Sequence, residues 1–334
     1  MNKPKIVIFA LGGTILMTGD SQTGVKPNLS AHDLIHSLPQ LAQMVDLEVE
    51  QLVQKPSGAL TIIDIAQLAS EVRDAAQRGV DGVVVIQGTD TIEETAFALD
   101  LMIRASCPVV ITGAMRNPSM AGSDGPANLV TAISAATNAE LADYGVIVAF
   151  DCELHLACHV AKQDSIKGDA FTSPLCGPIG RVVEDRLLLF SRPVDRKPFR
   201  FDQNDMLEAP PVALLTSSMN DDGRLITAAV DSGYKAIVLA AMGAGHVPPD
   251  VADRLEEAAS HIPTIFCSRN PGGQVCKKTY GYKGGEMDLL QRGLISSGWL
   301  SPLKAKILTS LMLGQNLGKE EISVSLQAYD GGSK

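Results

Sequence analysis

The 334-residue sequence lacks an excess of basic residues. Its 28 lysines and arginines are outnumbered by 38 aspartates and glutamates, which gives a net charge of −10. Nucleic acids and anionic membranes are bound through basic surfaces, so this charge argues against either as a partner. Long apolar runs are also missing, and those present are too short to span a bilayer. Glycine and proline are scattered rather than clustered, so no low-complexity tract is expected.

Cysteine is scarce, and its positions show no spacing typical of a disulfide framework. We expect free thiols at all six positions, Cys107, Cys152, Cys158, Cys176, Cys267 and Cys276. A signal peptide is not indicated either, because the apolar run after Lys3 and Lys5 is short and no small-residue cleavage pattern precedes Gly12. We interpret this run as the first strand of the fold and predict a cytoplasmic protein.

What the sequence does contain is an alternation of buried strands and helices. Continuous apolar and β-branched residues predict strands at residues 5–11, 81–88, 108–113 and 145–151. Helical spacing of apolar residues predicts a helix at 62–78, with Thr61 as its N-cap and Gly79 after its end. A second helix is expected at 126–139. Strands without alternation indicate a parallel sheet covered on both faces, and right-handed crossovers make such a sheet doubly wound.

A polar, proline-containing stretch at 191–205 predicts the link between two domains. We therefore expect a large N-terminal catalytic domain at 1–190, a linker at 191–210 and a smaller C-terminal domain at 211–334. Strand patterns resume after the linker in VALLTS, KAIVLAAMGAG and TIFCSR, and a helix is expected to begin at Ser301. The predicted fold class is α/β, with a doubly wound, mostly parallel sheet in the large domain and a smaller α/β unit after it.

Polar residues follow the predicted strands of the large domain. In open parallel sheets, ligands bind beyond the carboxyl ends of the strands, so these residues are expected at one edge. They are Thr14 after the first strand, Thr89 and Asp90 after the second, Ala114 after the third, and His155, His159 and Lys162 in a loop after the fourth. The sequence therefore places two threonines, a carboxylate and a lysine where a ligand is expected to bind.

These residue types suit acyl transfer. Threonine is a poor nucleophile until a base removes its proton, and a desolvated lysine can serve as that base. An aspartate can hold the lysine or a substrate ammonium group, and glycines let backbone N–H groups approach an oxyanion closely. A simpler alternative is that these residues cap helices: Thr91 and Glu94 predict a capping box at the start of the next helix. The Gly-Gly-Thr sequence lacks the spacing of a dinucleotide site.

Longer motifs resemble the bacterial-type L-asparaginase family. They are LGGTI at 11–15, QGTDTIEETAF at 87–97, PVVITGAMR and SDGPANL within 108–129, CGPIG at 176–180 and SSGWLSPLKAKILTSL at 296–311. The resemblance covers nearly the whole chain. It implies a homotetramer built from intimate dimers, in which the smaller domain of a neighbouring subunit completes each active site. It implies a small-molecule amide substrate, and we expect no cofactor and no metal ion.

The resemblance also assigns catalytic roles. Thr14 corresponds to the nucleophile that takes the acyl group. Thr89, Asp90 and Lys162 correspond to a second group, in which the lysine polarises the threonine and the aspartate binds the substrate's α-amine. These four residues are the predicted catalytic set.

Substrate-binding roles follow in the same way. Ser57 corresponds to the serine that contacts the α-carboxylate, and the Ala114 carbonyl to the group that receives the leaving amide nitrogen. Glu286 corresponds to the acidic residue lent by the neighbouring subunit. Three departures bear on the substrate: no tyrosine follows Thr14 in the lid loop, Gly58 replaces a usual glutamine, and His246 stands where an asparagine is frequent.

The leading hypothesis is an amidohydrolase that converts L-asparagine to L-aspartate and ammonia through a threonine acyl-enzyme. Alternatives are a hydrolase of the same fold that acts on glutamine or an N-substituted asparagine, an amidotransferase subunit, and an amino-acid-binding module without catalysis. The amidotransferase subunit is disfavoured, because that relative carries an extra N-terminal domain whereas the first strand is expected to begin at residue 5 here. The four predicted catalytic residues together disfavour the binding module. His155 and His159 could suggest zinc, but packing or support of Lys162 is the expected role. We do not expect Cys152 or Cys158 to act as a nucleophile.

Overall fold

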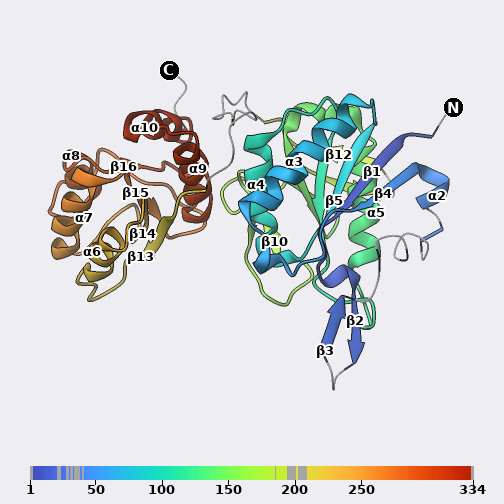
Figure 1. The fold of residues 1–334 in the computed structure, drawn as a ribbon, viewed down its shortest axis with the longest axis horizontal. Coiled ribbons are helices and arrows are strands. Elements are labelled where there is room, and N and C mark those ends of the chain that lie inside the picture. Colours follow the sequence, from blue (N-terminus) through green and yellow to red (C-terminus); the bar gives the residue numbers. More distant parts are fainter. Residues whose placement is uncertain are drawn as a thin grey trace. The chain divides into compact units, whose positions relative to one another are not determined.

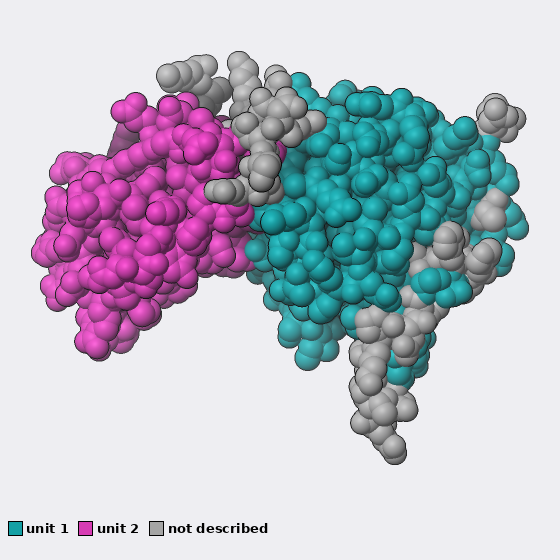
Figure 2. All heavy atoms as spheres, in the orientation of Figure 1, with its two compact units in different colours: residues 1–194 teal, residues 195–334 magenta. Residues whose placement is uncertain are grey.

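The computed structural model describes residues 3–20, 24–27, 30, 33, 38–39, 41–184, 186–193, 201 and 209–331. The chain divides into two compact units, Met1–Val194 and Asp195–Lys334 (Figure 2). Most of the predicted linker at 191–210 lies outside the described residues. In the described ranges, no helix is long and apolar enough to cross a membrane. All six cysteines are described and none forms a disulfide, as expected.

Unit 1 is built around an eight-stranded sheet with the order β12–β11–β8–β7–β6–β5–β1–β4 (Figure 1). Its parallel part consists of β4 (Asp46–Gln51), β1 (Lys5–Ala10), β5 (Gly82–Ile86), β6 (Val109–Thr112) and β7 (Val146–Phe150). Antiparallel pairing adds β8 (Glu153–Leu156), β11 (Gly180–Val183) and β12 (Arg186–Leu189). Every residue of β5, β6 and β7 is buried, as expected for strands covered on both faces. The four predicted strands are confirmed.

Helices cover both faces of this sheet. They are α3 (Ile62–Gln77), α4 (Ile92–Met102) and α5 (Gly125–Ala136), while the short α2 (Leu41–Met44) precedes β4. The predicted start of α3 is confirmed, because the Thr61 side chain accepts a hydrogen bond from the backbone N–H of Asp64 in a capping box. Figure 1 shows α3 and α4 on one side of the sheet and α5 on the other.

One expectation about the crossovers is wrong. The connections from β5 to β6 and from β6 to β7 run in the same direction along the sheet, but their helices α4 and α5 lie on opposite faces (Figure 1). The crossover through α5 therefore has the opposite hand from the crossover through α4, and the crossovers are not uniformly right-handed.

The segment after β7 is not the predicted loop. Asp151 and Cys152 have positive φ angles of 46° and 64°, as in a two-residue type I′ turn, and Phe150 pairs with Glu153 across it. The chain thus returns as β8. The pattern was missed because this turn lacks the Asn-Gly or Asp-Gly dipeptide that usually signals it. After β8 comes the short pair β9 (Ala161–Lys162) and β10 (Phe171–Thr172).

Unit 2 has its own parallel sheet, in the order β13–β14–β15–β16. Its strands are β13 (Val212–Thr216), β14 (Ala236–Ala241), β15 (Thr264–Ser268) and β16 (Ile295–Ser296). Its helices are α6 (Arg224–Asp231), α7 (Pro249–His261), α8 (Glu286–Gln291), α9 (Pro302–Gly314) and α10 (Lys319–Gln327). An apolar core that includes Leu239, Leu255 and Phe266 lies between sheet and helices. The predicted strands and the helix beginning after Ser301 are confirmed.

Acidification is expected to destabilise the protein through His155. Its side chain is fully buried in β8, and Nδ1 lies 3.0 Å from Ser173 Oγ. Burial lowers the pKa of His155 from 6.5 to about 4, although the charge of Glu153 opposes the shift. As the pH falls, the unfolded chain therefore protonates this imidazole at a higher pH than the folded protein does. The contribution of the neutral imidazole to the free energy of unfolding is fully present above pH 6.5 and is lost as the pH falls towards 4. The pKa difference corresponds to about 3 kcal/mol at most.

The urea midpoint, measured at about pH 7 and about pH 5, checks this expectation. His155→Asn should lose less stability than the wild type over this interval, because no imidazole remains to be protonated. The matched control is His261→Asn at an exposed position of unit 2, which should behave as the wild type does. Equal pH sensitivity of the wild type and His155→Asn would show that His155 does not cause the loss.

Candidate active site

The carboxyl ends of β1 and β5 meet through two glycines. Gly13 has a φ of 103°, and a Cβ at this position would overlap the backbone nitrogen of Gly88. Only glycine permits this approach. Thr14 follows Gly13 and Thr89 follows Gly88, so the two threonines begin neighbouring 3₁₀ turns, η1 (Thr14–Leu16) and η3 (Thr89–Thr91). Thr14 is half-buried and Thr89 is buried.

Ala114 lies beside the turn that carries Thr14. A Cβ at Gly125 would lie 2.8 Å from Ile15 Cγ1 and 3.5 Å from Ala114 Cβ, so the ends of β1 and β6 also meet. The loop after β6 is held by Asp124, whose carboxylate accepts hydrogen bonds from the backbone N–H groups of Met115 and Arg116, at 2.9 and 2.8 Å. The backbone around Ala114 is therefore fixed at the same edge of the sheet as Thr14.

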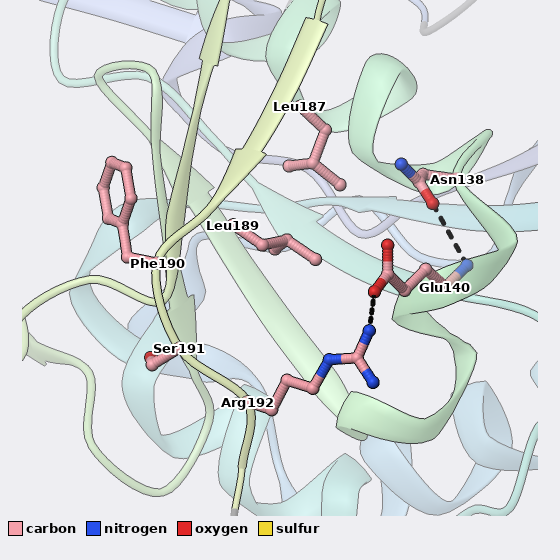
Figure 3. Close-up of a pocket in the computed structure, with 7 residues that line it drawn as sticks. All are labelled: Asn138, Glu140, Leu187, Leu189, Phe190, Ser191 and Arg192. Carbon is pink, nitrogen blue, oxygen red and sulfur yellow. Dashed lines mark hydrogen bonds and ion pairs between the residues drawn. The ribbon is translucent and has the colours of Figure 1, made fainter.

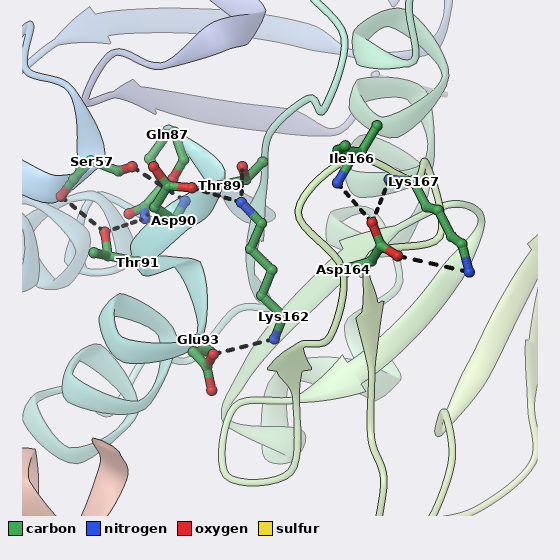
Figure 4. Close-up of polar contacts among 11 residues, drawn as sticks. Ser57, Gln87, Thr89, Asp90, Thr91, Glu93, Lys162, Asp164, Ile166 and Lys167 are labelled. Atoms are coloured by element: carbon green, nitrogen blue, oxygen red, sulfur yellow. Dashed lines mark hydrogen bonds and ion pairs between the residues drawn. The ribbon is translucent and has the colours of Figure 1, made fainter. Parts of the chain in front are cut away.

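Lys162 joins the group from a distant part of the chain. Its Nζ donates hydrogen bonds to Thr89 Oγ1 at 2.9 Å and to Asp90 Oδ1 at 2.7 Å (Figure 4). The lysine side chain is 15% exposed and the aspartate 75%, so the ammonium group lies inward and the carboxylate faces solvent. The backbone N–H of Lys162 donates to Glu93 Oε1 at 3.2 Å, which ties β9 to α4. The structure thus brings together Thr89, Asp90 and Lys162 as predicted.

Ser57 lies at the same place on a third turn, η2 (Ser57–Ala59). Its Oγ accepts a hydrogen bond from the backbone N–H of Asp90 at 3.3 Å, and its carbonyl accepts one from Thr91 Oγ1 at 3.1 Å. The next residue, Gly58, is exposed, and no described atom would lie within 4 Å of a Cβ there. A longer side chain at position 58 therefore has room beside Ser57.

The predicted capping box of Thr91 and Glu94 is wrong. Thr91 is the N-cap of α4, but its side chain makes no capping hydrogen bond within the described part of the chain. It contacts Ser57 instead, because the preceding residues form η3 and carry Thr91 against η2 (Figure 4). Sequence reasoning also missed the contacts of Gln87 and Glu93. Both residues lie within the motif QGTDTIEET, and their place in this motif was the feature of the sequence that could have indicated a role in the site.

Glu286 and His246 form a separate pair in unit 2. Glu286 is fully buried, and its Oε1 accepts hydrogen bonds from the backbone N–H groups of Thr279 and Tyr280, each at 2.8 Å. Burial alone would raise the pKa of Glu286, but these N–H donors and His246 outweigh it and lower the pKa. His246 Nε2 lies 3.4 Å from Glu286 Oε2, and its ring meets that of Tyr280 edge-on. Their assignment to a neighbour's site stays a prediction.

A pocket of about 370 Å³ lies elsewhere on unit 1 (Figure 3). It is lined by Asn138, Glu140, Leu187, Leu189, Phe190, Ser191 and Arg192, and Arg192 forms an ion pair with Glu140. None of the predicted site residues lines it. We therefore place the candidate site by the convergence of polar groups at the strand ends. In the described residues, no group of three or more His, Cys, Asp and Glu side chains could hold a metal ion.

Comparison with known proteins identifies the family. Residues 5–195 match the family Asparaginase, N-terminal, and residues 211–324 match the Glutaminase/Asparaginase C-terminal domain. The chain is 32% identical to a probable periplasmic L-asparaginase of Haemophilus influenzae, over 93% of this chain and 89% of that protein. It is 31% identical to L-asparaginase 2 of Escherichia coli, over 98% of this chain and 93% of that protein.

A solved structure agrees with the sequence relatives. The crystal structure of a probable cytoplasmic L-asparaginase from Campylobacter jejuni has a TM-score of 0.89 and 32% sequence identity to this chain. The match covers 98% of this chain and all of that one. This chain therefore belongs to the asparaginase family.

Proposed function

We propose that this protein is an amidohydrolase that converts L-asparagine to L-aspartate and ammonia through a threonine acyl-enzyme. The observation that carries the proposal is the double contact of Lys162 Nζ with Thr89 Oγ1 and Asp90 Oδ1. This cluster lies beside the glycine contact that brings Thr14 to the same edge. The relatives named as L-asparaginases in Haemophilus influenzae and Escherichia coli supply the substrate class.

In the proposed reaction, Thr14 Oγ1 attacks the side-chain amide carbon of the substrate. The proton of Thr14 passes to Thr89 Oγ1, which Lys162 Nζ polarises, while Thr89 gives its own hydroxyl proton to the leaving nitrogen. The C–N bond then breaks, and the Ala114 carbonyl accepts a hydrogen bond from the departing ammonia. Backbone N–H groups near Gly13 and Gly88 stabilise the oxyanion. Water then hydrolyses the ester on Thr14 and releases aspartate.

The same residues explain how the substrate is oriented. Asp90 binds the α-amine, because its carboxylate faces solvent while remaining fixed by Lys162. Ser57 binds the α-carboxylate from the adjacent turn. An amide that carries both groups is therefore held with its side chain towards Thr14, and such positioning contributes much of the rate.

A coupled ammonia assay over asparagine, glutamine and N-substituted asparagines tests the proposal. Asparagine should give the highest kcat/KM. A higher value with another amide would favour the rival hydrolase of the same fold. Glutamine is the first such amide to test, because this chain is 30% identical to a glutaminase-asparaginase of Pseudomonas fluorescens. Absence of turnover with every amide would favour a binding module.

The proposal includes a homotetramer built from intimate dimers, with Glu286 and His246 of each subunit reaching a neighbour's site. Support comes from the family membership and from the Glu286–His246 pair, in which Glu286 Oε2 accepts no hydrogen bond from the described residues and lies 3.4 Å from His246 Nε2. We propose no cofactor. A cytoplasmic location stays a prediction, since the relatives' names include both a periplasmic and a cytoplasmic protein.

Gly58→Gln is expected to raise kcat/KM for asparagine. The site is exposed and open beside Ser57, so a glutamine amide can reach the α-carboxylate. One hydrogen bond to a charged group is worth about 1.5–3 kcal/mol, which is about ten- to a hundredfold in kcat/KM. The added bulk should at the same time penalise an N-substituted asparagine.

The measurement is kcat/KM for asparagine and for one N-substituted asparagine in both proteins. Ala59→Gln adds the same side chain at the next residue, which is also exposed, and should leave the ratio of the two values unchanged. If Gly58→Gln also leaves this ratio unchanged, Gly58 does not line the substrate site.

A further inference from the structure

Thr91 holds two turns of the candidate site together. It stands at the N-cap of α4, where a threonine side chain normally accepts a hydrogen bond from the helix N-terminus. Its hydroxyl instead donates to the carbonyl of Ser57 at 3.1 Å. The same hydroxyl accepts a hydrogen bond from Gln87 Nε2 at 3.4 Å (Figure 4). The Thr91 hydroxyl thus donates across to η2 and accepts from Gln87, which precedes η3 in the chain.

Ser57 is held at two points by residues of η3. Thr91 binds its carbonyl, and the backbone N–H of Asp90 binds its Oγ at 3.3 Å. A Cβ at Gly88 would lie 2.8 Å from Ser57 Oγ, so the two turns are also in close packing contact. A shift of η2 relative to η3 would break both hydrogen bonds. The distance between Ser57 and the Thr89–Asp90 pair is therefore fixed by this contact.

Gln87 orients the hydroxyl group of Thr91 by donating a hydrogen bond to it. Its side chain is fully buried, and Nε2 donates to the Gly88 carbonyl at 3.2 Å as well as to Thr91. Among the described residues, Gln87 Oε1 has no hydrogen-bond partner. The amide is therefore fixed through its NH₂ group alone, and this donor directs the Thr91 hydroxyl proton towards Ser57.

We propose that Thr91 is a positioning residue that sets how tightly the site binds an α-amino acid. The inference rests on the proposed function, because it acts through the binding of the α-carboxylate by Ser57. Thr91 does not touch the reacting atoms. Its loss lets η2 move away from Asp90, so the two groups that hold the substrate's ammonium and carboxylate no longer match the spacing of one amino acid.

The test compares Thr91→Val, which removes the hydroxyl at nearly constant volume, with Thr91→Ser, which keeps it. Thr91→Val should raise KM for asparagine and Kd for the product L-aspartate by about tenfold, the loss expected for one hydrogen bond. Its kcat should stay within about threefold, because the reacting groups are unchanged. Thr91→Ser should restore wild-type values. Thr95→Val removes another buried hydroxyl of α4 and should leave KM unchanged.

A double-mutant cycle separates positioning from a general structural role. In a Ser57→Ala background, which keeps the carbonyl but removes the hydroxyl, Thr91→Val should raise KM no further, because the group it positions is gone. Additive effects in the cycle, or an unchanged KM in Thr91→Val alone, overturn the inference while leaving the proposed function intact. A wild type that releases no ammonia from asparagine overturns the proposed function and this inference with it.

Discussion

Replacing Thr14 by alanine or Thr89 by valine is expected to lower kcat for asparagine by about 10³-fold or more in each case. Thr14 supplies the nucleophilic oxygen of the proposed reaction. Thr89 Oγ1 is the partner of Lys162 Nζ at 2.9 Å, so valine leaves the lysine without the hydroxyl it polarises. Because the two residues act as one unit, the double variant should be little worse than either single variant.

The measurement is kcat of each purified variant, together with its thermal midpoint to show that the fold persists. Thr14 is half-buried and valine fills nearly the same volume as threonine at position 89, so little stability should be lost. Thr137→Val at the end of α5 is the matched control, since it removes a hydroxyl bonded only to the Ser134 carbonyl in the described structure, and its kcat should be that of the wild type. Near-normal turnover in either site variant would refute the assignment.

The parts of this fold that could be predicted are those set by local sequence. Strands buried on both faces have continuous apolar residues, and β5 and β7 were predicted for that reason. The start of α3 was also predictable, because Thr61 and Asp64 satisfy each other within one turn. The hairpin from β7 to β8 was missed because Asp151 and Cys152 adopt positive φ without a glycine to signal it.

Sequence reasoning named residues that come together at the candidate site, but it missed several of their contacts. The family resemblance predicted that Lys162 contacts Thr89, and no local pattern could have done so, because their hydrogen bond joins residues that are 73 positions apart. Thr91 shows the limit most clearly, because its local sequence is that of a capping box while its hydroxyl bonds to Ser57, 34 positions away. Spacing along the chain carries no information about which turn of another element a side chain will meet.

Glu286→Gln is expected to lower kcat/KM for asparagine by about ten- to a hundredfold, because a proposed contact with a charged group of the substrate is lost. Glutamine keeps an Oε1 that can accept the backbone N–H groups of Thr279 and Tyr280, so α8 should still begin at the same residue. The variant therefore tests the negative charge of the Glu286 carboxylate and leaves its contacts with the backbone in place. An unchanged kcat/KM would remove Glu286 from the proposed site.

The stronger expectation concerns mixed oligomers of Thr14→Ala and Glu286→Gln. If each site takes Thr14 from one subunit and Glu286 from its neighbour, a mixed dimer has one site with both original residues and one with neither. Random reassociation of equal amounts then restores about a quarter of the wild-type sites, so kcat/KM per subunit should recover to about a quarter of the wild-type value. Mixing Thr14→Ala with the double variant Thr14→Ala/Glu286→Gln is the control and should restore nothing. If Glu286 instead served the site of its own chain, no mixed dimer would contain an intact site, and the first mixture would show only the residual activity of its parents.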